Sequence, residues 1–146
     1  MGTMLQAHDL TLEDFEGHEG CNEILNVTRP DVVRAVHDAY FEVGVDLVET
    51  NTFGANWANL AEYDITERIE ELAQAGARIA RESADHRSTP QQPRFVIGSV
   101  GPGTKLPTLG HAPYALLRDA YQRQVEGMLA GGVDAVLVET VQDVLQ

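Results

Sequence analysis

The sequence has few cysteines, which crosslink a chain, and few basic residues, which attract anionic partners. Its single cysteine, Cys21, excludes an intramolecular disulfide and a CxxC metal site within the chain. Ten basic residues stand against 23 acidic ones, which gives a formal net charge of -13. Because so negative a surface repels phosphate groups and anionic lipids, neither nucleic acid nor a membrane is an expected partner.

Long apolar runs and nucleotide-binding motifs are also missing. No apolar run approaches the roughly 20 residues that cross a bilayer, and the segment Met1 to Gln6 lacks the regions of a signal peptide. We therefore expect a cytoplasmic protein. No GxGxxG or GxxxxGK[ST] motif follows an apolar run, and the five histidines show no HxH or HExxH spacing. The roles of Cys21 and His111 stay open, and neither is expected to bind metal.

Short apolar runs alternate with helical patterns along the chain. Apolar residues spaced at i, i+3 and i+4 predict three helices, over residues 28–43, 64–86 and 117–131, with Thr28 and Asp64 as caps. Apolar runs bounded by glycine and proline predict strands over 46–49, 94–100 and 133–139. Such alternation is typical of a parallel sheet with right-handed crossovers.

Two of the predicted strands share one design. Gly44-Val45-Asp46 leads into Val48-Glu49-Thr50, and Gly132-Val133-Asp134 leads into Val138-Glu139-Thr140. The repetition predicts a repeated βα unit with a carboxylate at the end of each strand. Because ligands bind at the carboxyl ends of parallel strands, Glu49 and Glu139 are the first candidates for a binding site.

Polar residues at the end of every strand favour a (βα) barrel over an open sheet. A complete barrel needs about 250 residues and eight strands, whereas this chain has 146 residues and three clear strands. The predicted fold class is therefore α/β, a partial (βα)8 TIM-type barrel that is truncated at both ends. Residues 1–146 would form roughly its first half and lack the start of the first strand.

Three stretches together resemble the homocysteine-binding domain of cobalamin-dependent methionine synthases, within the homocysteine S-methyltransferase superfamily. The similarity covers essentially the whole chain, and its Glu-Thr-Asn-Thr-Phe segment is quite specific. The matching stretches are Met1 to Gln6 with Gly20 to Glu23, Ala39 to Gly54, and Gly98 to Pro107 with Val138 to Thr140.

The resemblance implies a methyltransferase of methionine biosynthesis. Such an enzyme transfers a methyl group to the sulfur of homocysteine, which zinc bound by three cysteines holds as a thiolate. Methylcobalamin, the methyl donor, lies on a separate module. The resemblance matches Glu139 to the residue that holds the substrate's amino group and places Thr50, Thr52 and Gly2 near its carboxylate end.

Two departures from the family pattern limit what this chain is expected to do. The family has an Asp-Gly pair just upstream of the segment that matches Met1, and its zinc cysteines match positions beyond residue 146. We therefore expect a piece of the enzyme that is inactive alone and binds neither zinc nor cobalamin. Its expected partners are the rest of the barrel and the cobalamin module.

Other interpretations of the same residues remain open. Glu49 is expected to support structure by bonding loop N–H groups or a barrel partner. Instead of an enzyme, the chain could be a non-catalytic partial-barrel module that self-associates through open strand edges. An unrelated (βα) barrel enzyme would need a Schiff-base lysine or a phosphate loop, but the one lysine, Lys105, follows a Gly-Pro-Gly-Thr segment that is not a P-loop.

Overall fold

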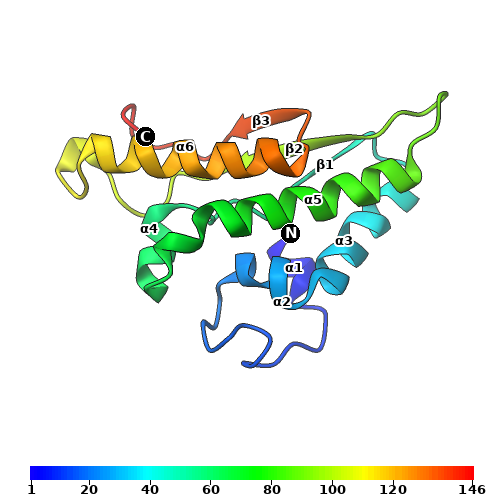
Figure 1. Cartoon of the computed structure of the whole chain (residues 1–146), viewed down its shortest axis with the longest axis horizontal. Coiled ribbons are helices and arrows are strands. Elements are labelled where there is room, and N and C mark those ends of the chain that lie inside the picture. The colour runs from blue at the N-terminus through cyan, green and yellow to red at the C-terminus, as the bar shows by residue number, and fades with distance from the viewer.

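Three parallel strands, in the order β1-β2-β3, form one sheet in a computed structural model that describes residues 1–146 (Figure 1). The strands are β1 (Leu47–Glu49), β2 (Phe95–Val100) and β3 (Ala135–Val138). Val48 lies opposite Val96, and Ser99 lies opposite Leu137. All three predicted strands are thus confirmed, with ends shifted by one or two residues.

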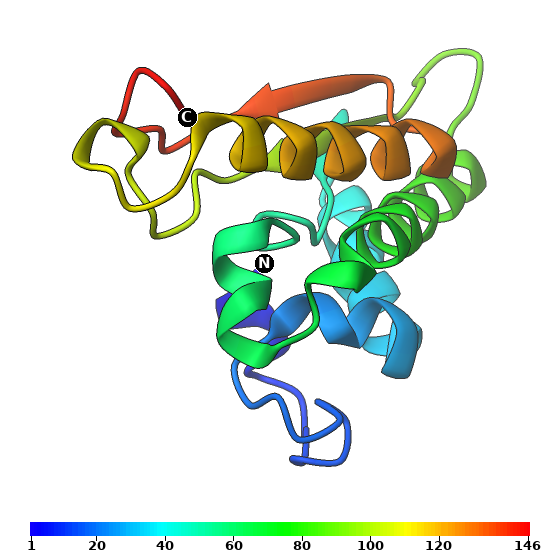
Figure 2. The ribbon, with the colours of Figure 1, turned by 60° about the vertical axis from the view of Figure 1, so that its left-hand side comes forward.

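Three long helices alternate with the strands, which confirms the predicted order. Helices α5 and α6 run side by side across the sheet (Figures 1 and 2). None of the helices combines the length and the apolar character that a membrane-spanning helix needs. The helices are α1 (Gly2–Leu5), α2 (Leu25–Thr28), α3 (Pro30–Glu42), α4 (Trp57–Leu60), α5 (Ile69–Arg87) and α6 (Tyr114–Gly131), with 3-10 turns at Asn22–Ile24, Ala61–Tyr63, Thr66–Arg68 and Pro107–Leu109.

The helices cover only one face of the sheet. Val48 and Val96 pack there against residues of α3 and α5 and are buried. On the other face Leu47 and Phe95 are each 44% exposed. Strand β3, at the edge of the sheet, is exposed along all four residues. Strand β2 is therefore buried on the face that the helices cover, while on its other face Phe95 is exposed and Ser99 is buried.

The glycine of the repeated Gly-Val-Asp turn has the same left-handed conformation in both copies. Gly44 and Gly132 follow α3 and α6 with φ of 97° and 95°, where the lack of a Cβ removes the steric cost. Each turn then bonds to β2: the carbonyl of Asp46 accepts from the N–H of Phe95 at 2.9 Å, and the carboxylate of Asp134 accepts from the N–H of Val96 at 2.7 Å. The predicted βα repeat is confirmed.

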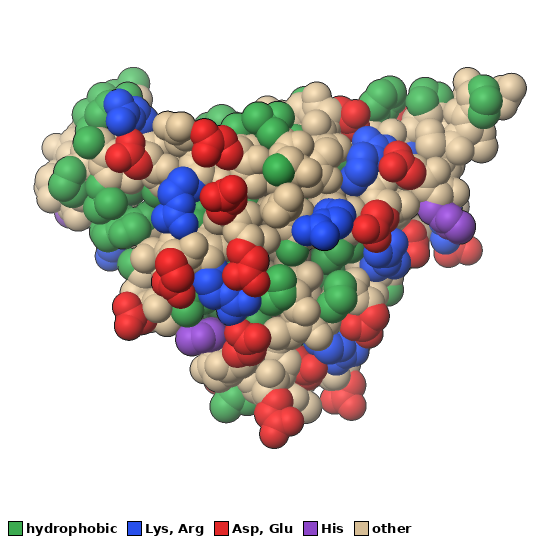
Figure 3. All heavy atoms as spheres, in the orientation of Figure 1, with side chains coloured by type: hydrophobic (Ala, Val, Ile, Leu, Met, Phe, Trp, Pro, Cys, Tyr) green, Lys and Arg blue, Asp and Glu red, His purple; other side chains and the backbone are tan.

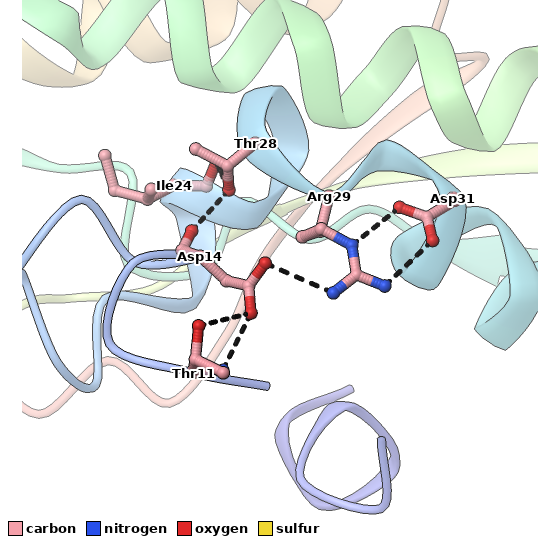
Figure 4. A network of polar contacts seen from close by, with 6 residues as sticks. All are labelled: Thr11, Asp14, Ile24, Thr28, Arg29 and Asp31. Carbon is pink, nitrogen blue, oxygen red and sulfur yellow. Dashed lines mark hydrogen bonds and ion pairs between the residues drawn. The ribbon is translucent and has the colours of Figure 1, made fainter. Parts of the chain in front are cut away.

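The two predicted helix caps are wrong. The hydroxyl of Thr28 donates to the carbonyl oxygen of Asp14 at 2.6 Å, while α3 begins at Pro30 without a side-chain cap (Figure 4). Arg29 ties the same loop down through ion pairs to Asp14 and Asp31, at 3.2 and 3.0 Å. Asp64 has φ of 59° and lies five residues before α5, so it ends a turn and caps nothing.

Acidic and basic side chains are interspersed on the face of the molecule seen in Figure 3. Some ion pairs of the chain join two exposed groups, such as Arg118 with Asp119 at 2.7 Å. Pairs of this kind contribute little to stability because water screens them. The high negative charge is therefore a property of the solvated surface.

Candidate functional site

A cavity of about 590 Å³ opens at the carboxyl ends of β1 and β3. Four residues singled out in the sequence line it: Gly2, Glu49, Thr50 and Glu139. Thr52 does not line it and is fully buried behind Thr50. The lining also contains Glu23, His37 and Ser99, which the sequence did not single out, and no lysine or arginine.

Glu139 directly follows β3 and is half-buried at the cavity wall. The hydroxyl of Ser99 donates a hydrogen bond to its Oε1, and its backbone N–H donates to the carbonyl of Val100 at 3.1 Å. The next residue, Thr140, has φ of 60°, a conformation that is rare for β-branched residues. Strand β2 therefore holds the carboxylate of Glu139, and the backbone turns sharply at the next residue, Thr140.

The hydroxyl protons of Thr50 and Thr52 are both used inside the chain. Thr52 Oγ1 donates to the carbonyl of Ser99 at 2.7 Å, and the two threonine oxygens are 2.6 Å apart. Because each hydroxyl has one proton, Thr50 must donate to Thr52. Thr50 Oγ1 in turn accepts from the N–H of Ser99 at 3.0 Å. Neither threonine has a proton left for a ligand.

Side chains from several distant segments form hydrogen bonds with the backbone of the loop after β1. Asn26 Nδ2 donates to the carbonyl of Asn51 at 2.8 Å, and Gln124 Nε2 donates to the carbonyl of Thr52 at 2.7 Å. Glu23 Oε1 accepts from the N–H of Gly54 at 2.8 Å. Asn26 and Gln124 are buried and support the cavity wall from behind, while Glu23 lines the cavity. Only the position of Glu23 in the Gly-Cys-Asn-Glu segment hinted at this role in the sequence.

The chain's only thiol does not fit a metal site. Burial raises the pKa of Cys21 to about 11, so the sulfur is protonated at neutral pH. Burial also raises the pKa of the neighbouring carboxyl of Glu23. No group of three or more His, Cys, Asp or Glu side chains comes close enough to hold a metal ion. The residues of this chain therefore do not fit the three-cysteine zinc site that the resemblance implies.

Glu49 lies on the uncovered face and is exposed. Its carboxylate lines the cavity, but it makes no hydrogen bond or ion pair with any part of the chain. The loop N–H groups that Glu49 was expected to bond are therefore not its partners. Glu139, by contrast, is held by a neighbouring strand.

His37 of α3 lies in the wall of the cavity, although it stands beside charged Asp38 in the sequence. It is 1% exposed, and its Nε2 has no hydrogen-bond partner. The predicted apolar stripe is correct for Val32, Val33 and Val36, but Tyr40 and Val43 are 44% and 80% exposed. The buried row instead continues through His37 and Phe41, and Phe41 packs against Ala80 and Ala84 of α5.

His37 is expected to make stability depend on pH. Burial lowers its pKa from 6.5 to about 4, opposed by nearby Asp38 and assisted by the N-terminal amine and Arg34. Between those values the unfolded state binds more protons than the folded state, so stability falls as pH drops from 6.5 to 4. The shift corresponds to about 3 kcal/mol. Urea unfolding at several pH values measures the slope.

His37→Leu removes the titrating group and leaves no buried polar partner unpaired. We expect its stability to fall less steeply than that of the wild type as the pH drops over this window. The matched control is His86→Gln, at an exposed histidine in the last turn of α5. An unchanged slope in His37→Leu would contradict the assignment.

Comparison with known proteins places the whole chain in one family. A family model described as homocysteine S-methyltransferase matches residues 1–146. Methionine synthase from Mycobacterium tuberculosis is 63% identical over all 146 residues, and that from Mycobacterium leprae is 62% identical. The chain spans 12% of the length of each of these relatives.

Solved structures show the same fold. The metallated form of the homocysteine methyltransferase MmuM from Escherichia coli superposes with a TM-score of 0.75 at 21% identity. The match covers 99% of this chain and 53% of that one. Its oxidized form gives a TM-score of 0.70 at 20% identity. The likeness supports an α/β fold with parallel strands.

Proposed function

Because the chain belongs to the homocysteine S-methyltransferase family, we propose that it supplies the amino-acid end of the homocysteine site in a methionine synthase. The observation that carries this proposal is the position of Glu139, whose half-buried carboxylate lines the cavity. Partial burial strengthens its attraction for an ammonium group. No lysine or arginine in the lining competes for it.

In this proposal Glu139 binds the amino group of homocysteine. Gly2 and Thr50 lie in the same cavity, at the end assigned to the substrate carboxylate, and Thr52 supports Thr50 from behind. Holding the amino-acid end in one place would orient the sulfur for methyl transfer, which gives methionine. Zinc and methylcobalamin belong to the proposed whole enzyme. This chain lacks a fitting zinc donor set, so its own contribution is orientation.

A partial (βα)8 barrel is the architecture that we propose for residues 1–146. The support is a parallel sheet with helices on one face, an uncovered apolar second face and two edges that no strand covers. In a complete barrel the second face would be the interior. The rest of the barrel and a cobalamin module are the proposed partners, and a cytoplasmic location stays a prediction.

Titration with L-homocysteine tests the proposed function. We expect saturable NMR shifts at Glu139 and Thr50 with weak, millimolar affinity, because one end of the ligand alone is held. The matched control ligand is 4-sulfanylbutanoate, which keeps the thiol and the carboxylate but lacks the amino group. Equal affinity for both ligands, or no shift with either, would overturn the proposal.

Assembly through the sheet edge is a second candidate function. Asp46 and Thr50 bond to β2, at 2.9 and 3.0 Å, so the alternation of a parallel strand turns the backbone groups of Leu47 and Glu49 toward the open edge. Unpaired edges of this kind invite another strand. We expect size-exclusion chromatography to show a mass that rises with concentration, and a monomer at all concentrations would exclude this function.

An unrelated barrel enzyme is excluded, since the family match covers the whole chain.

A further inference from the structure

We propose that Ser99 is a positioning residue that aims Glu139 at the substrate's amino group. The inference rests on the proposed function and concerns a residue to which the family resemblance assigned no role. Ser99 lies in β2 next to its last residue and is 2% exposed. Its hydroxyl donates to Oε1 of Glu139, which follows the neighbouring strand β3. The contact therefore joins two strands at the cavity wall.

The backbone of Ser99 is fixed on both sides of its peptide. Its N–H donates to Thr50 Oγ1 at 3.0 Å, and its carbonyl accepts from Thr52 Oγ1 at 2.7 Å. The two threonines close this ring through their own 2.6 Å contact. A serine held in this way has little freedom to move, so its hydroxyl presents a donor in one fixed place.

This arrangement gives the two threonines an indirect role. Their hydroxyl protons go to Thr52 Oγ1 and to the carbonyl of Ser99, so they have none to donate to a substrate carboxylate. Their effect reaches the ligand through Ser99 and then Glu139. The two threonines and Ser99 therefore support the carboxylate. In this series of contacts only Glu139 binds the substrate.

The hydrogen bond from Ser99 also selects which oxygen of Glu139 faces the ligand. Oε1 accepts from the serine hydroxyl, and Oε2 makes no hydrogen bond or ion pair within the chain. A charge-assisted hydrogen bond of this kind is strong and directional. It restricts the side chain to one orientation and leaves Oε2 for an ammonium group. The carboxylate thereby keeps one oxygen for the protonated amino group of a ligand.

Ser99→Ala tests the inference without any ligand. Three-bond couplings along the Glu139 side chain, measured by NMR, report whether it occupies one rotamer. We expect a single rotamer in the wild-type chain and averaged couplings in Ser99→Ala. The matched control is Ile97→Val, two residues earlier in β2 and outside the cavity lining. A purely structural serine would lower the unfolding midpoint but leave these couplings unchanged, and that result would overturn the proposal.

Binding measurements separate this inference from the proposed function. We expect Ser99→Ala to bind L-homocysteine about tenfold more weakly, because the lost bond is to a charged group, while Ile97→Val binds as the wild type does. Unchanged affinity despite averaged couplings would also overturn the inference. If even the wild-type chain fails to bind homocysteine, the proposed function falls, and averaged couplings in Ser99→Ala would still support the orienting contact.

Discussion

Glu139→Gln is expected to weaken L-homocysteine binding by roughly tenfold to a hundredfold, the range for losing a hydrogen bond to a charged group. Glutamine has the same shape and can still accept from Ser99 Oγ, so the cavity wall should keep its form. What the substitution removes is the negative charge that faces the substrate's amino group. NMR titration of both proteins under the same buffer and salt conditions measures the ratio of the affinities.

Glu49→Gln is the matched control for this experiment. Glu49 lines the same cavity and also follows the Gly-Val-Asp design, but its carboxylate is exposed and has no partner. Water screens an exposed charge, so we expect its loss to change affinity by less than about threefold. Equal losses in the two variants would show that the cavity attracts the ligand by its total charge and not through Glu139.

Adding methyl groups at Gly127 and Gly131 together is expected to destabilise the chain by about 4 kcal/mol. Both glycines lie on the side of α6 that meets α5. A Cβ at Gly127 would come within 2.6 Å of the carbonyl of Glu70, and one at Gly131 within 2.5 Å of the Cβ of Ala77. Backbone atoms cannot move aside alone, so the two helices would have to separate along their shared length.

Urea unfolding of Gly127→Ala/Gly131→Ala measures the change in the free energy of unfolding. The steric clash lowers this free energy, and the helix propensity of alanine raises it. Alanine is the better helix former by about 1 kcal/mol per residue, so a pair of glycines in open space would become more stable when replaced. The control is Ala130→Gly, an exposed neighbouring position, which measures the helix preference by itself. A double variant as stable as the wild type would contradict the close approach of α5 and α6.

Local patterns in the sequence predicted the elements well. All six residues of the expected stripe on α5 are buried: Ile69, Leu72, Ala73, Gly76, Ile79 and Ala80. The strands and both Gly-Val-Asp turns also lie where expected, and the family resemblance is confirmed. The helical stripe, the strands and the turns each depend on residues that are close together in the sequence. Local patterns are therefore enough to predict them.

The errors arose where a distant segment competes with a local signal. Thr28 had the pattern of a cap, but the carbonyl of Asp14, in the N-terminal loop, takes its proton. His37 sits beside charged Asp38, yet the packing of α5 decides which side of α3 is buried. Neither competitor is visible in a window of ten residues.

The candidate site divides in the same way. Glu139, Thr50 and Gly2 were recognised from strand ends and the resemblance, and the structure brings them to one cavity. Ser99 and Glu23 were missed, because one lies inside an apolar strand and the other in an irregular segment. Their relevance depends on partners 40 and 31 residues away, at Glu139 and Gly54.

The sequence by itself determined which chemical groups stand at the ends of the strands, because the alternation of apolar runs and glycine turns is local. Only the tertiary structure decided where each proton goes, with Thr50 and Thr52 bonded inward and Oε2 of Glu139 left free. It also decided that α6 must have glycine where it crosses α5. Both depend on distances between segments far apart in the chain, and packing of the whole domain sets those distances.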